Sequence, residues 1–500
     1  MAAATVERDQ TATPSELSPV VRAMLKRAGD AKAYARWQAQ VAQTGYCSHP
    51  VRLAGTVEAA DPATGELRTT YSTETEPDGT LLVACGNRRA SRCPSCSETY
   101  RRDAFHLVRA GLAGGKGLPE TVAAHPRVFA TFTAPSFGRV HTRRARGGTV
   151  HPCHPARLGE RCPHGRRLAC WHKHEQDDAR LGEPICPCCY DAQGQALWNA
   201  IAPELWRRTT IALRRALARE LGLTNEQFAQ RARVAYVKVA EYQARGAVHF
   251  HAVFRLDGRD PADPTAVLPP PDGVSVDLLE RAIRMAAERA RVLVPSFAGV
   301  PARAARWGPQ LDLRVIRATG EDSEELSAER VAGYVAKYAT KGTEGLGAAL
   351  DQRIHHRAQI ERLDVPEHVR ELVVACWELG GRPELRGLRL RQWAHMLGFR
   401  GHFATKSRRY STTFGHLRRA RVLHAARRRH GEAAWLDEWG RLLPSPDAVL
   451  VASWDFVGRD YRTPADAELA ASLAAWAREQ RQTARDELAA TRGRAGRTSR

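Results

Sequence analysis

The sequence has no run of 18 or more apolar residues, so no part of it is expected to cross a membrane. Residues Met1 to Pro19 lack the apolar core of a secretory signal peptide. Both absences favour a cytoplasmic protein with no membrane partner. Structural disulfides are rare in that compartment, so the 11 cysteines indicate metal binding or buried thiols. The sequence also lacks a Gly-x-x-x-x-Gly-Lys-Ser/Thr loop, which argues against a phosphate-loop nucleotide triphosphatase.

Positive charge is abundant. The chain carries 76 Lys and Arg against 55 Asp and Glu, a formal net charge of +21 and an isoelectric point near 10. An excess of this size suggests a polyanionic partner, most often nucleic acid. An Arg-rich composition produced by GC-rich coding DNA is the alternative. With 500 residues, 43% of them hydrophobic, the chain is expected to fold into about two to four domains.

Residues 126–345 are predicted to form a central α+β domain. Its strands are expected at 128–133, 234–242, 248–256 and 311–317, and its helices at 195–221, 277–293 and 327–341. The order β-α-β-β-α-β is that of a ferredoxin-like fold with an antiparallel sheet, here interrupted by a cysteine-rich insertion at 139–195. Four further regions are expected: 1–18, disordered; 19–125, with a helix over 19–40 and zinc-binding cysteines; 346–480, helical, basic and DNA-binding; and 481–500, an Arg-rich tail that is disordered over 491–500.

Two histidines share one face of a predicted strand. Side chains alternate along a strand, so His249 and His251 point to one side and Phe250 to the other. A hairpin loop of three residues, Ala244–Gly246, would place Glu241 opposite His249. The carboxylate and the two imidazoles can then converge on one ion, and this donor set suits Mg²⁺ or Mn²⁺ with positions left for phosphate oxygens. The alternative is that the paired histidines are packing residues.

The predicted helix 327–341 carries two tyrosines and two lysines on one stripe. Tyr334, Lys337, Tyr338 and Lys341 follow the i, i+3, i+4, i+7 spacing of a helix face. A tyrosine oxygen can attack phosphorus and later leave again, which conserves the bond energy in a covalent intermediate. The lysine that follows each tyrosine would place positive charge near the phosphate. The alternative is an amphipathic helix whose tyrosines pack with only their hydroxyls exposed.

A first group of cysteines lies near the N-terminus. Cys93 and Cys96 form a Cys-x-x-Cys pair, and Cys47 and Cys85 precede it. Four thiolates close a tetrahedral structural zinc site, which is the function predicted for this group. Free buried thiols are the alternative. The single Cys376, in an apolar helix, is expected in the core.

A second group lies in the insertion and offers more ligands than one ion needs: Cys153, Cys162, His164, Cys170, His172, His174, Cys186, Cys188 and Cys189. Cys186 and Cys189 form a Cys-x-x-Cys pair and are the first choice. Cys162 and Cys170 are expected to join them, with His164 and His174 as substitutes and Cys188 as a spare thiol. Two structural zinc ions are therefore predicted for the chain.

Residues 407–430 carry eight arginines, with Tyr410 and Phe414 between them. Arginine contacts phosphate, and aromatic rings stack on unpaired bases. The candidate DNA-binding residues are Arg408, Arg409, Tyr410, Arg418 and Arg419. A solvated helix face would produce the same pattern.

Three segments occur in the order of the motifs of rolling-circle replication initiators, which are His-hydrophobic-His endonucleases. Phe129-Ala-Thr-Phe-Thr-Ala-Pro135 resembles the first motif, His249-Phe-His251 the second, and the two-tyrosine helix the third. The Tyr-x-x-x-Tyr spacing resembles that of single-stranded phage initiators. The cysteine clusters and Lys406-Ser-Arg-Arg-Tyr-Ser411 resemble plasmid initiators of the actinomycete type, so the resemblance covers roughly residues 45–420. Relaxases that resemble this fold usually carry their tyrosine before the histidines, whereas here it follows.

This resemblance implies an enzyme that nicks and rejoins plasmid origin DNA, single-stranded at the nick. Tyr338 or Tyr334 would attack a phosphate at the metal on Glu241, His249 and His251, which leaves a 5′-phosphotyrosine and a free 3′-hydroxyl. Tyr338 is expected to cut first, because single-tyrosine relatives keep this position and have Glu at the other. A host helicase and a host DNA polymerase would be partners. A transposase with the same chemistry and a non-catalytic, zinc-dependent DNA-binding regulator are the alternative functions.

Overall fold

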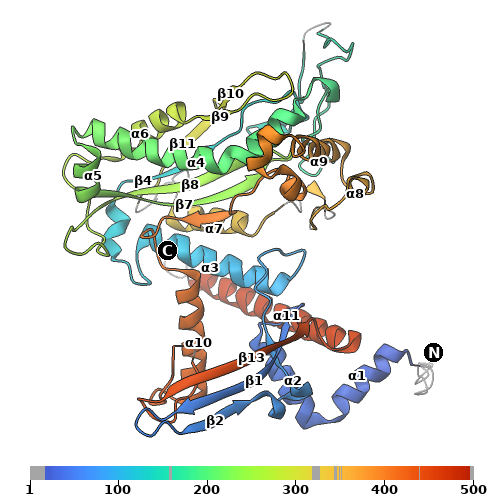
Figure 1. Cartoon of the computed structure of the whole chain (residues 1–500), viewed down its shortest axis with the longest axis vertical. Helices are drawn as coiled ribbons and strands as arrows, with labels where there is room; N and C mark the ends of the chain where they lie inside the picture. Colours follow the sequence, from blue (N-terminus) through green and yellow to red (C-terminus); the bar gives the residue numbers. More distant parts are fainter. Residues whose placement is uncertain are drawn as a thin grey trace, which may run out of the picture. The chain divides into compact units, whose positions relative to one another are not determined.

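The computed structural model describes residues 17–156, 160–317, 327–342, 346–347, 350, 352–438 and 440–495. The chain divides into two compact units (Figure 1). Unit 1 combines the two ends of the chain, Met1–Tyr100 and Gly415–Arg500, and unit 2 is the continuous stretch Arg101–Phe414. Both units contain helices and antiparallel strands, which confirms the mixed α+β class. No described helix combines the length and the apolar character needed to cross a membrane.

Unit 1 is built around an antiparallel sheet with strand order β13-β1-β2, in which β3 also pairs with β1. β1 and β13 pair from Val51↔Arg459 to Ala60↔Val449, so this sheet needs both ends of the chain. The elements are α1 (Pro19–Gly29), α2 (Ala31–Gln43), β1 (Val51–Ala60), β2 (Leu67–Ser72), β3 (Leu81–Val83), β13 (Val449–Arg459) and α11 (Pro464–Ala495), with parts of α3 (Pro94–Ala113) and α10 (Phe414–His430).

Several predictions for the chain ends are wrong. The helix expected over 19–40 is two helices, because the Asp30 side chain accepts hydrogen bonds from the N–H groups of Lys32 and Ala33 and so begins α2. The region 346–480 was expected to be mostly helical, and most of its described elements are helices, but it also contains the strand β13. α11 continues to Ala495, into the tail for which disorder was expected. The disorder predicted for residues 1–18 falls, up to residue 16, outside the described residues.

Unit 2 contains an antiparallel sheet of strand order β11-β4-β8-β7-β12. The helices α4 and α6 cover one face of the sheet, and α7 lies on the other (Figure 1). The predicted strands and helices of this unit are present, with bounds shifted by a few residues. They are β4 (Arg127–Phe132), α4 (Ala192–Glu220), β7 (Ala232–Tyr242), β8 (Val248–Gly258), α6 (Val276–Arg289), β11 (Leu311–Val315) and α7 (Ala328–Ala339).

Further elements of unit 2 surround this sheet. The insertion between β4 and α4 contains a short hairpin and no described α-helix. Another short strand, β12, extends the sheet by pairing with β7. The bounds are β5 (Arg144–Arg146), β6 (Thr149–His151), β12 (Ala404–Lys406), β9 (Val292–Val294), β10 (Arg303–Ala305), α5 (Asn225–Arg231), α8 (Arg357–Glu361) and α9 (Glu367–Leu379).

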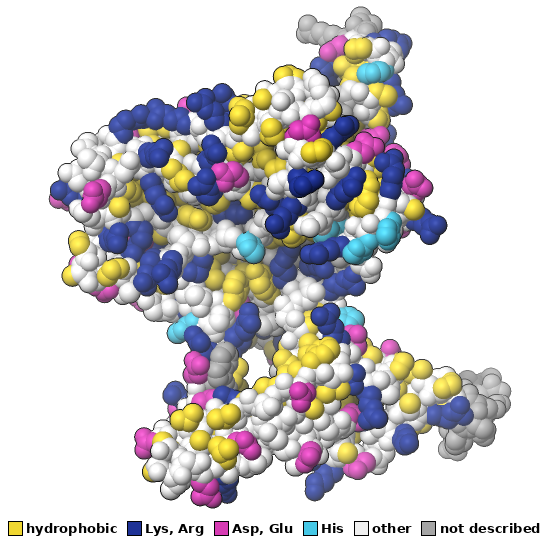
Figure 2. Space-filling view, viewed as in Figure 1, with side chains coloured by type: hydrophobic (Ala, Val, Ile, Leu, Met, Phe, Trp, Pro, Cys, Tyr) yellow, Lys and Arg dark blue, Asp and Glu magenta, His cyan; other side chains and the backbone are white. Residues whose placement is uncertain are grey.

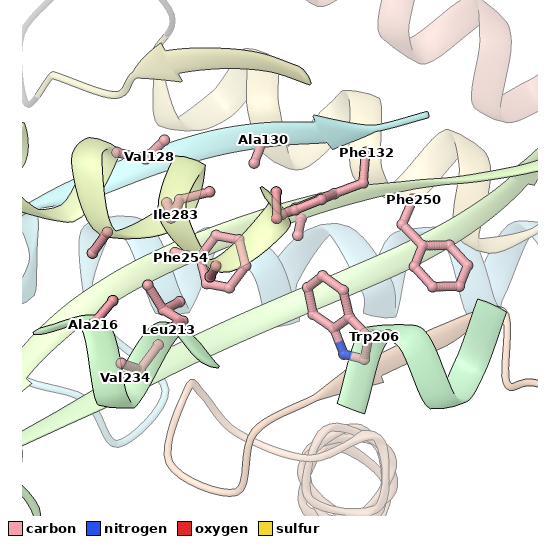
Figure 3. Close-up of a cluster of buried hydrophobic side chains, with 14 of the residues drawn as sticks. Val128, Ala130, Phe132, Trp206, Leu213, Ala216, Val234, Phe250, Phe254 and Ile283 are labelled. Atoms are coloured by element: carbon pink, nitrogen blue, oxygen red, sulfur yellow. The ribbon is translucent and has the colours of Figure 1, made fainter. Parts of the chain in front are cut away.

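The sheet face towards α4 and α6 forms the main core. Phe132 and Phe250 of the strands pack edge-to-face on Trp206 of α4, with ring centroids 5.7 and 5.9 Å apart (Figure 3). Ile283 of α6 closes the same cluster. Because side chains alternate along a strand, burial of Phe250 directs His249 and His251 to the opposite face, under α7.

Candidate active site and metal clusters

The two histidines and the glutamate meet at the β7–β8 hairpin. Glu241 pairs with His249 in the predicted register, and Gly246 turns the chain with a φ of 79°. The Oε2 atom of Glu241 lies 2.9 Å from Nε2 of His249 and 3.1 Å from Nε2 of His251. The two Nε2 atoms are 3.1 Å apart. The structure therefore brings the three predicted metal ligands to one point, and we call them the His-His-Glu triad.

The spacing of these atoms suits an octahedral ion. Ligand atoms about 2.1 Å from such an ion and at right angles to each other lie about 3.0 Å apart, which matches all three distances. Tetrahedral ligands with the same bond length would lie about 3.4 Å apart. The donor set of two imidazoles and one carboxylate leaves further positions of an octahedral ion for other ligands. The triad can therefore hold a divalent ion such as Mg²⁺ or Mn²⁺ that keeps positions for other ligands.

The surroundings of the triad favour protonation states and ring orientations that suit metal binding. Burial would raise the pKa of Glu241, but hydrogen bonds from His249 and His251 lower that pKa to about 2. Burial lowers the pKa of His251, although Glu241 opposes the effect. The Thr131 hydroxyl lies 3.1 Å from Nδ1 of His251, and the Phe129 ring stacks on the imidazole. An ionised carboxylate and a neutral imidazole of fixed orientation are the states in which these groups bind metal.

Helix α7 places both tyrosines over the triad. The Tyr334 hydroxyl lies 3.3 Å from Nε2 of His251. The rings of Tyr334 and Tyr338 are 4.6 Å apart, and their centroids lie 5.0 and 5.4 Å from that of His251. The helix begins where the Ser327 side chain accepts a hydrogen bond from the N–H of Arg330. Both predicted nucleophiles thus lie beside the predicted metal ligands.

Both lysines of α7 lie near the ring of Tyr338. Lys341 Nζ lies 4.8 Å from the ring centroid of Tyr338, and Lys337 Nζ lies 5.7 Å from the same ring. Lys341 Nζ is also 3.7 Å from Oε1 of Glu241. Both lysines therefore place positive charge near the Tyr338 ring.

Strand β11 contributes two residues that sequence reasoning missed. Asp312 pairs with Thr131 and Arg314 with Phe129, so both lie next to the strand that supports His251. The Nε atom of Arg314 is 3.0 Å from a carboxylate oxygen of Asp312. Alternation along the predicted strand was the only available signal, and it does not distinguish a site face from a solvent face.

The first cysteine group is assembled as predicted. Sγ of Cys85 lies 3.7 Å from Sγ of Cys96, and Sγ of Cys47 lies 3.8 Å from Sγ of Cys93. Sulfur ligands of a tetrahedral zinc ion, with bonds of about 2.3 Å, lie about 3.8 Å apart. The backbone N–H of Cys85 donates a hydrogen bond to Sγ of Cys47, an arrangement that stabilises a thiolate. These four residues can therefore hold a zinc ion.

The second cysteine group is in fact two clusters. Cluster A contains His141, Cys153, Cys170 and His174, and cluster B contains Cys162, His164, Cys186 and Cys189. The expected set was thus wrong for Cys170, whose place is taken by His164. His141 was not a predicted ligand. The described residues therefore offer three Cys/His clusters instead of two. Cys188 is exposed and belongs to no cluster, and Cys376 is buried in the core, both as predicted.

Comparison with known proteins identifies the family of the chain. A family model described as "Replication initiator protein, pSAM2" matches residues 33–475. The chain belongs to this family. It is similar to a replication initiator protein of Streptomyces ambofaciens, with 46% identity over 477 residues that cover 94% of this chain and 96% of that protein. No solved structure matches it. The expected resemblance to plasmid replication initiators is thereby confirmed at the level of the family.

In this replication initiator the predicted DNA-binding residues are divided between the units. Tyr410 was a wrong choice: it is fully buried, and its hydroxyl donates a hydrogen bond to the carbonyl of Val108, so its ring cannot stack on a base. Arg418 and Arg419 lie on α10 in unit 1. In unit 2, where Lys and Arg side chains are frequent on the visible face (Figure 2), Arg408 and Arg409 line a groove of about 590 Å³. Four further arginines line it: Arg214, Arg215, Arg233 and Arg259.

Proposed function

We propose that this replication initiator is a metal-dependent tyrosine DNA nickase of the His-hydrophobic-His type, which nicks and rejoins the origin DNA of its plasmid. The observation that carries the proposal is the contact between α7 and the triad, with the Tyr334 hydroxyl 3.3 Å from Nε2 of His251. The strand order β11-β4-β8-β7, with two helices on one face, supports a ferredoxin-like assignment for the sheet of unit 2.

The reaction proposed is a transesterification. The Tyr338 oxygen attacks the scissile phosphorus, the bond from phosphorus to the 3′ oxygen breaks, and a 5′-phosphotyrosine forms. The tyrosine proton is lost and a proton is gained by the departing 3′ oxygen, so the products are the covalent adduct and a free 3′-hydroxyl. Lys337 and Lys341 provide positive charge beside the Tyr338 ring, which carries the attacking oxygen. A Mg²⁺ or Mn²⁺ ion held by the triad would polarise the phosphate.

Two tyrosines suit a reaction that is carried out twice, once to open the strand and once to close it. The rings of Tyr334 and Tyr338 are 4.6 Å apart, so small side-chain rotations allow both hydroxyls to reach one phosphate. Tyr338 cuts first in this proposal, because both lysines lie beside its ring. Tyr334 then accepts the strand at termination.

The arginine-lined groove is proposed to bind the phosphate backbone of origin DNA. Arg233 donates hydrogen bonds to the carbonyls of Pro264 and Ala266, which fixes one wall of the groove. Burial lowers the pKa of Arg233, although Asp257 opposes the effect, and the charge of Arg409 lowers it further. Several arginines that line one groove favour the binding of a polyanionic ligand.

Zinc is the ion proposed for the Cys/His clusters. A host helicase would supply unwinding, because the sequence has no phosphate loop, and a host polymerase would extend the 3′-hydroxyl. Among the alternative functions, family membership favours a replication initiator over a transposase. The regulator without catalysis is separated from the nickase by experiment.

The test uses a single-stranded origin oligonucleotide labelled at its 3′ end, so that the label stays with any 5′-linked protein. Wild-type protein with Mn²⁺ is expected to form a labelled adduct that survives denaturing gels. Tyr338→Phe should lose at least 100-fold of the initial rate, an order-of-magnitude figure for loss of a nucleophile. Tyr34→Phe, in unit 1, is the matched control and should react normally. An adduct formed by the double variant of Tyr334 and Tyr338 would place the nucleophile elsewhere, and DNA binding without any wild-type adduct would favour the regulator.

A further inference from the structure

The insertion between β4 and α4 has almost no hydrophobic core. In its cysteine-rich part, the described residues 139–156 and 160–190, the regular elements are the β5–β6 hairpin and one 3-10 turn, Pro187–Cys189. Ile185 is the only buried aliphatic side chain there, and the other buried residues are Cys153, Cys162, His174, Gly182, Pro184 and Cys186. Four of those six are members of cluster A or cluster B. A segment that buries so little apolar surface needs another source of stability, and bound metal is a common one.

The ligands of the two clusters alternate in pairs along the chain. Cluster A takes the first pair, His141 and Cys153, and cluster B takes the next, Cys162 and His164. The third pair returns to cluster A and the fourth to cluster B; these are Cys170 with His174 and Cys186 with Cys189. Each cluster therefore closes a loop of chain that contains ligands of the other.

Backbone hydrogen bonds between described residues on either side of 162–166 link the two clusters in the manner of a hairpin. At its base, the N–H of Cys170 donates to the carbonyl of His154 at 2.9 Å, and the N–H of His154 donates back to Cys170 at 2.8 Å. Cys153 and Cys170 of cluster A thus lie at the base. Near the tip, the N–H of Cys162 donates to the carbonyl of Arg166 at 2.9 Å, which places Cys162 of cluster B there.

A second backbone pairing connects the clusters again. The N–H of His141 donates to the carbonyl of Glu183 at 2.8 Å, and the N–H of Ile185 donates to the carbonyl of Arg139 at 2.9 Å. His141 belongs to cluster A, and the chain after Ile185 leads directly to Cys186 of cluster B. An ion in either cluster would therefore hold both paired segments in place for the other.

The ligand atoms given below for the two clusters lie 3.2 to 3.5 Å apart, close to the roughly 3.3 to 3.8 Å expected between nitrogen and sulfur ligands of a tetrahedral zinc ion. In cluster A, Sγ of Cys170 lies 3.5 Å and Nδ1 of His141 lies 3.2 Å from Nε2 of His174. The other ring nitrogen of His174 is held at 2.6 Å by Asp178, which fixes the orientation of the imidazole. In cluster B, Sγ of Cys162 lies 3.5 Å from Sγ of Cys186, and Nδ1 of His164 lies 3.2 Å from Sγ of Cys189.

We infer that the described residues 139–156 and 160–190 form one module, held together by the two interleaved clusters, which binds two zinc ions cooperatively. The inference rests on the proposal that zinc occupies these clusters, and it is independent of the nicking reaction. Loss of one ligand from cluster A releases the hairpin base and the 139–141 segment, and with them the geometry of cluster B. Neither ion is bound stably without the other, whereas the cysteine group of unit 1 keeps its own ion.

The zinc content of purified full-length variants tests this coupling. Wild-type protein, washed with a weak chelator, should contain three zinc ions per chain by elemental analysis. Cys170→Ser, in cluster A, and Cys186→Ser, in cluster B, should each contain one, because both module ions are lost together. Cys188→Ser, an exposed cysteine outside the clusters, is the matched control and should retain three. Cys85→Ser, in the unit 1 group, should retain two.

A second measurement decides the question if a cluster variant fails to fold. Cys85→Ser protein, which keeps the module intact, is titrated with a strong chelator and followed by native mass spectrometry. The two-zinc and zinc-free species should interconvert without accumulation of a one-zinc species. Accumulation of that species, or a Cys170→Ser protein with two zinc ions, would show independent sites and overturn the inference. Wild-type protein near zero zinc would reject the zinc assignment as well, while an inactive nickase with three zinc ions would leave the module unaffected.

Discussion

The buried Lys238 of β7 allows a test of how the core behind the active site tolerates a charged side chain. Its side chain points into the core between Phe250, whose ring centroid lies 4.1 Å from Nζ, and the carbonyl of His402, which accepts a hydrogen bond at 3.1 Å. Burial lowers the pKa of Lys238 from 10.5 to about 7. This difference corresponds to roughly 5 kcal/mol of lost stability at or below neutral pH.

The sign of the pH dependence follows from proton binding. Between pH 7 and about 10.5 the unfolded chain keeps the Lys238 proton and the folded chain loses it, so the free energy of unfolding rises with pH by about 1.4 kcal/mol per unit from this residue. Lys238→Met removes the charge but leaves the His402 carbonyl unpaired, which costs about 1–3 kcal/mol. We therefore expect the variant to be about 2–4 kcal/mol more stable than wild type at pH 7, and to lose this advantage by pH 9.

Urea denaturation of unit 2, followed by the fluorescence of its buried tryptophans, measures both values. Lys116→Met, at an exposed lysine of the same unit, is the matched control and should behave as wild type. Equal stabilities of wild type and Lys238→Met at pH 7, or a difference that does not change between pH 7 and pH 9, would refute the buried-charge argument.

Three further predictions concern the site and its partners. His249→Ala should reduce Mn²⁺-dependent nicking by about 100-fold or more while duplex binding in a mobility-shift assay is unchanged; equal nicking rates would remove the metal role. Replacing Arg408 and Arg409 by Ala should weaken DNA binding and lower the slope of log affinity against log salt by about two, and an unchanged slope would mean that they contact no phosphate. Gly182→Ala should weaken Mn²⁺ binding measured by calorimetry, because a Cβ at this position, with φ of 90°, would lie 2.3 Å from the backbone of Ala244 in the β7–β8 hairpin. Unchanged Mn²⁺ affinity would show that the hairpin does not depend on this contact.

The positions of the triad and of the two tyrosines could be predicted because they depend on local rules of strand and helix geometry. The register of Glu241 and His249 follows from strand alternation and a three-residue turn that ends in Gly246, all within eleven residues. The stripe of Tyr334 and Tyr338 follows from helical periodicity alone. These rules do not depend on the rest of the chain, which is why the triad and the tyrosines were found from the sequence.

The features that the sequence did not reveal depend on contacts between segments that are far apart in the chain. Strand β13 pairs with β1, whose residues lie near the other end of the chain, so no local pattern near 449–459 revealed its partner. Cys170 was assigned to the wrong cluster because spacing shows which residues can bind metal but not how two interleaved sets are shared. Tyr410 lies in a basic stretch, yet its ring packs against Gly111 of a distant helix, a burial that composition does not indicate.

The pairing of β1 with β13 also affects how the protein is made. On the ribosome, the first hundred residues emerge with an unfinished sheet, and they cannot complete it until the last strand is synthesised. Unit 2 emerges in one continuous piece and has no such delay. A nonsense mutation shortly after residue 415 would therefore leave the segment with the triad and tyrosines able to fold, but would leave the N-terminal strands exposed to aggregation and proteolysis.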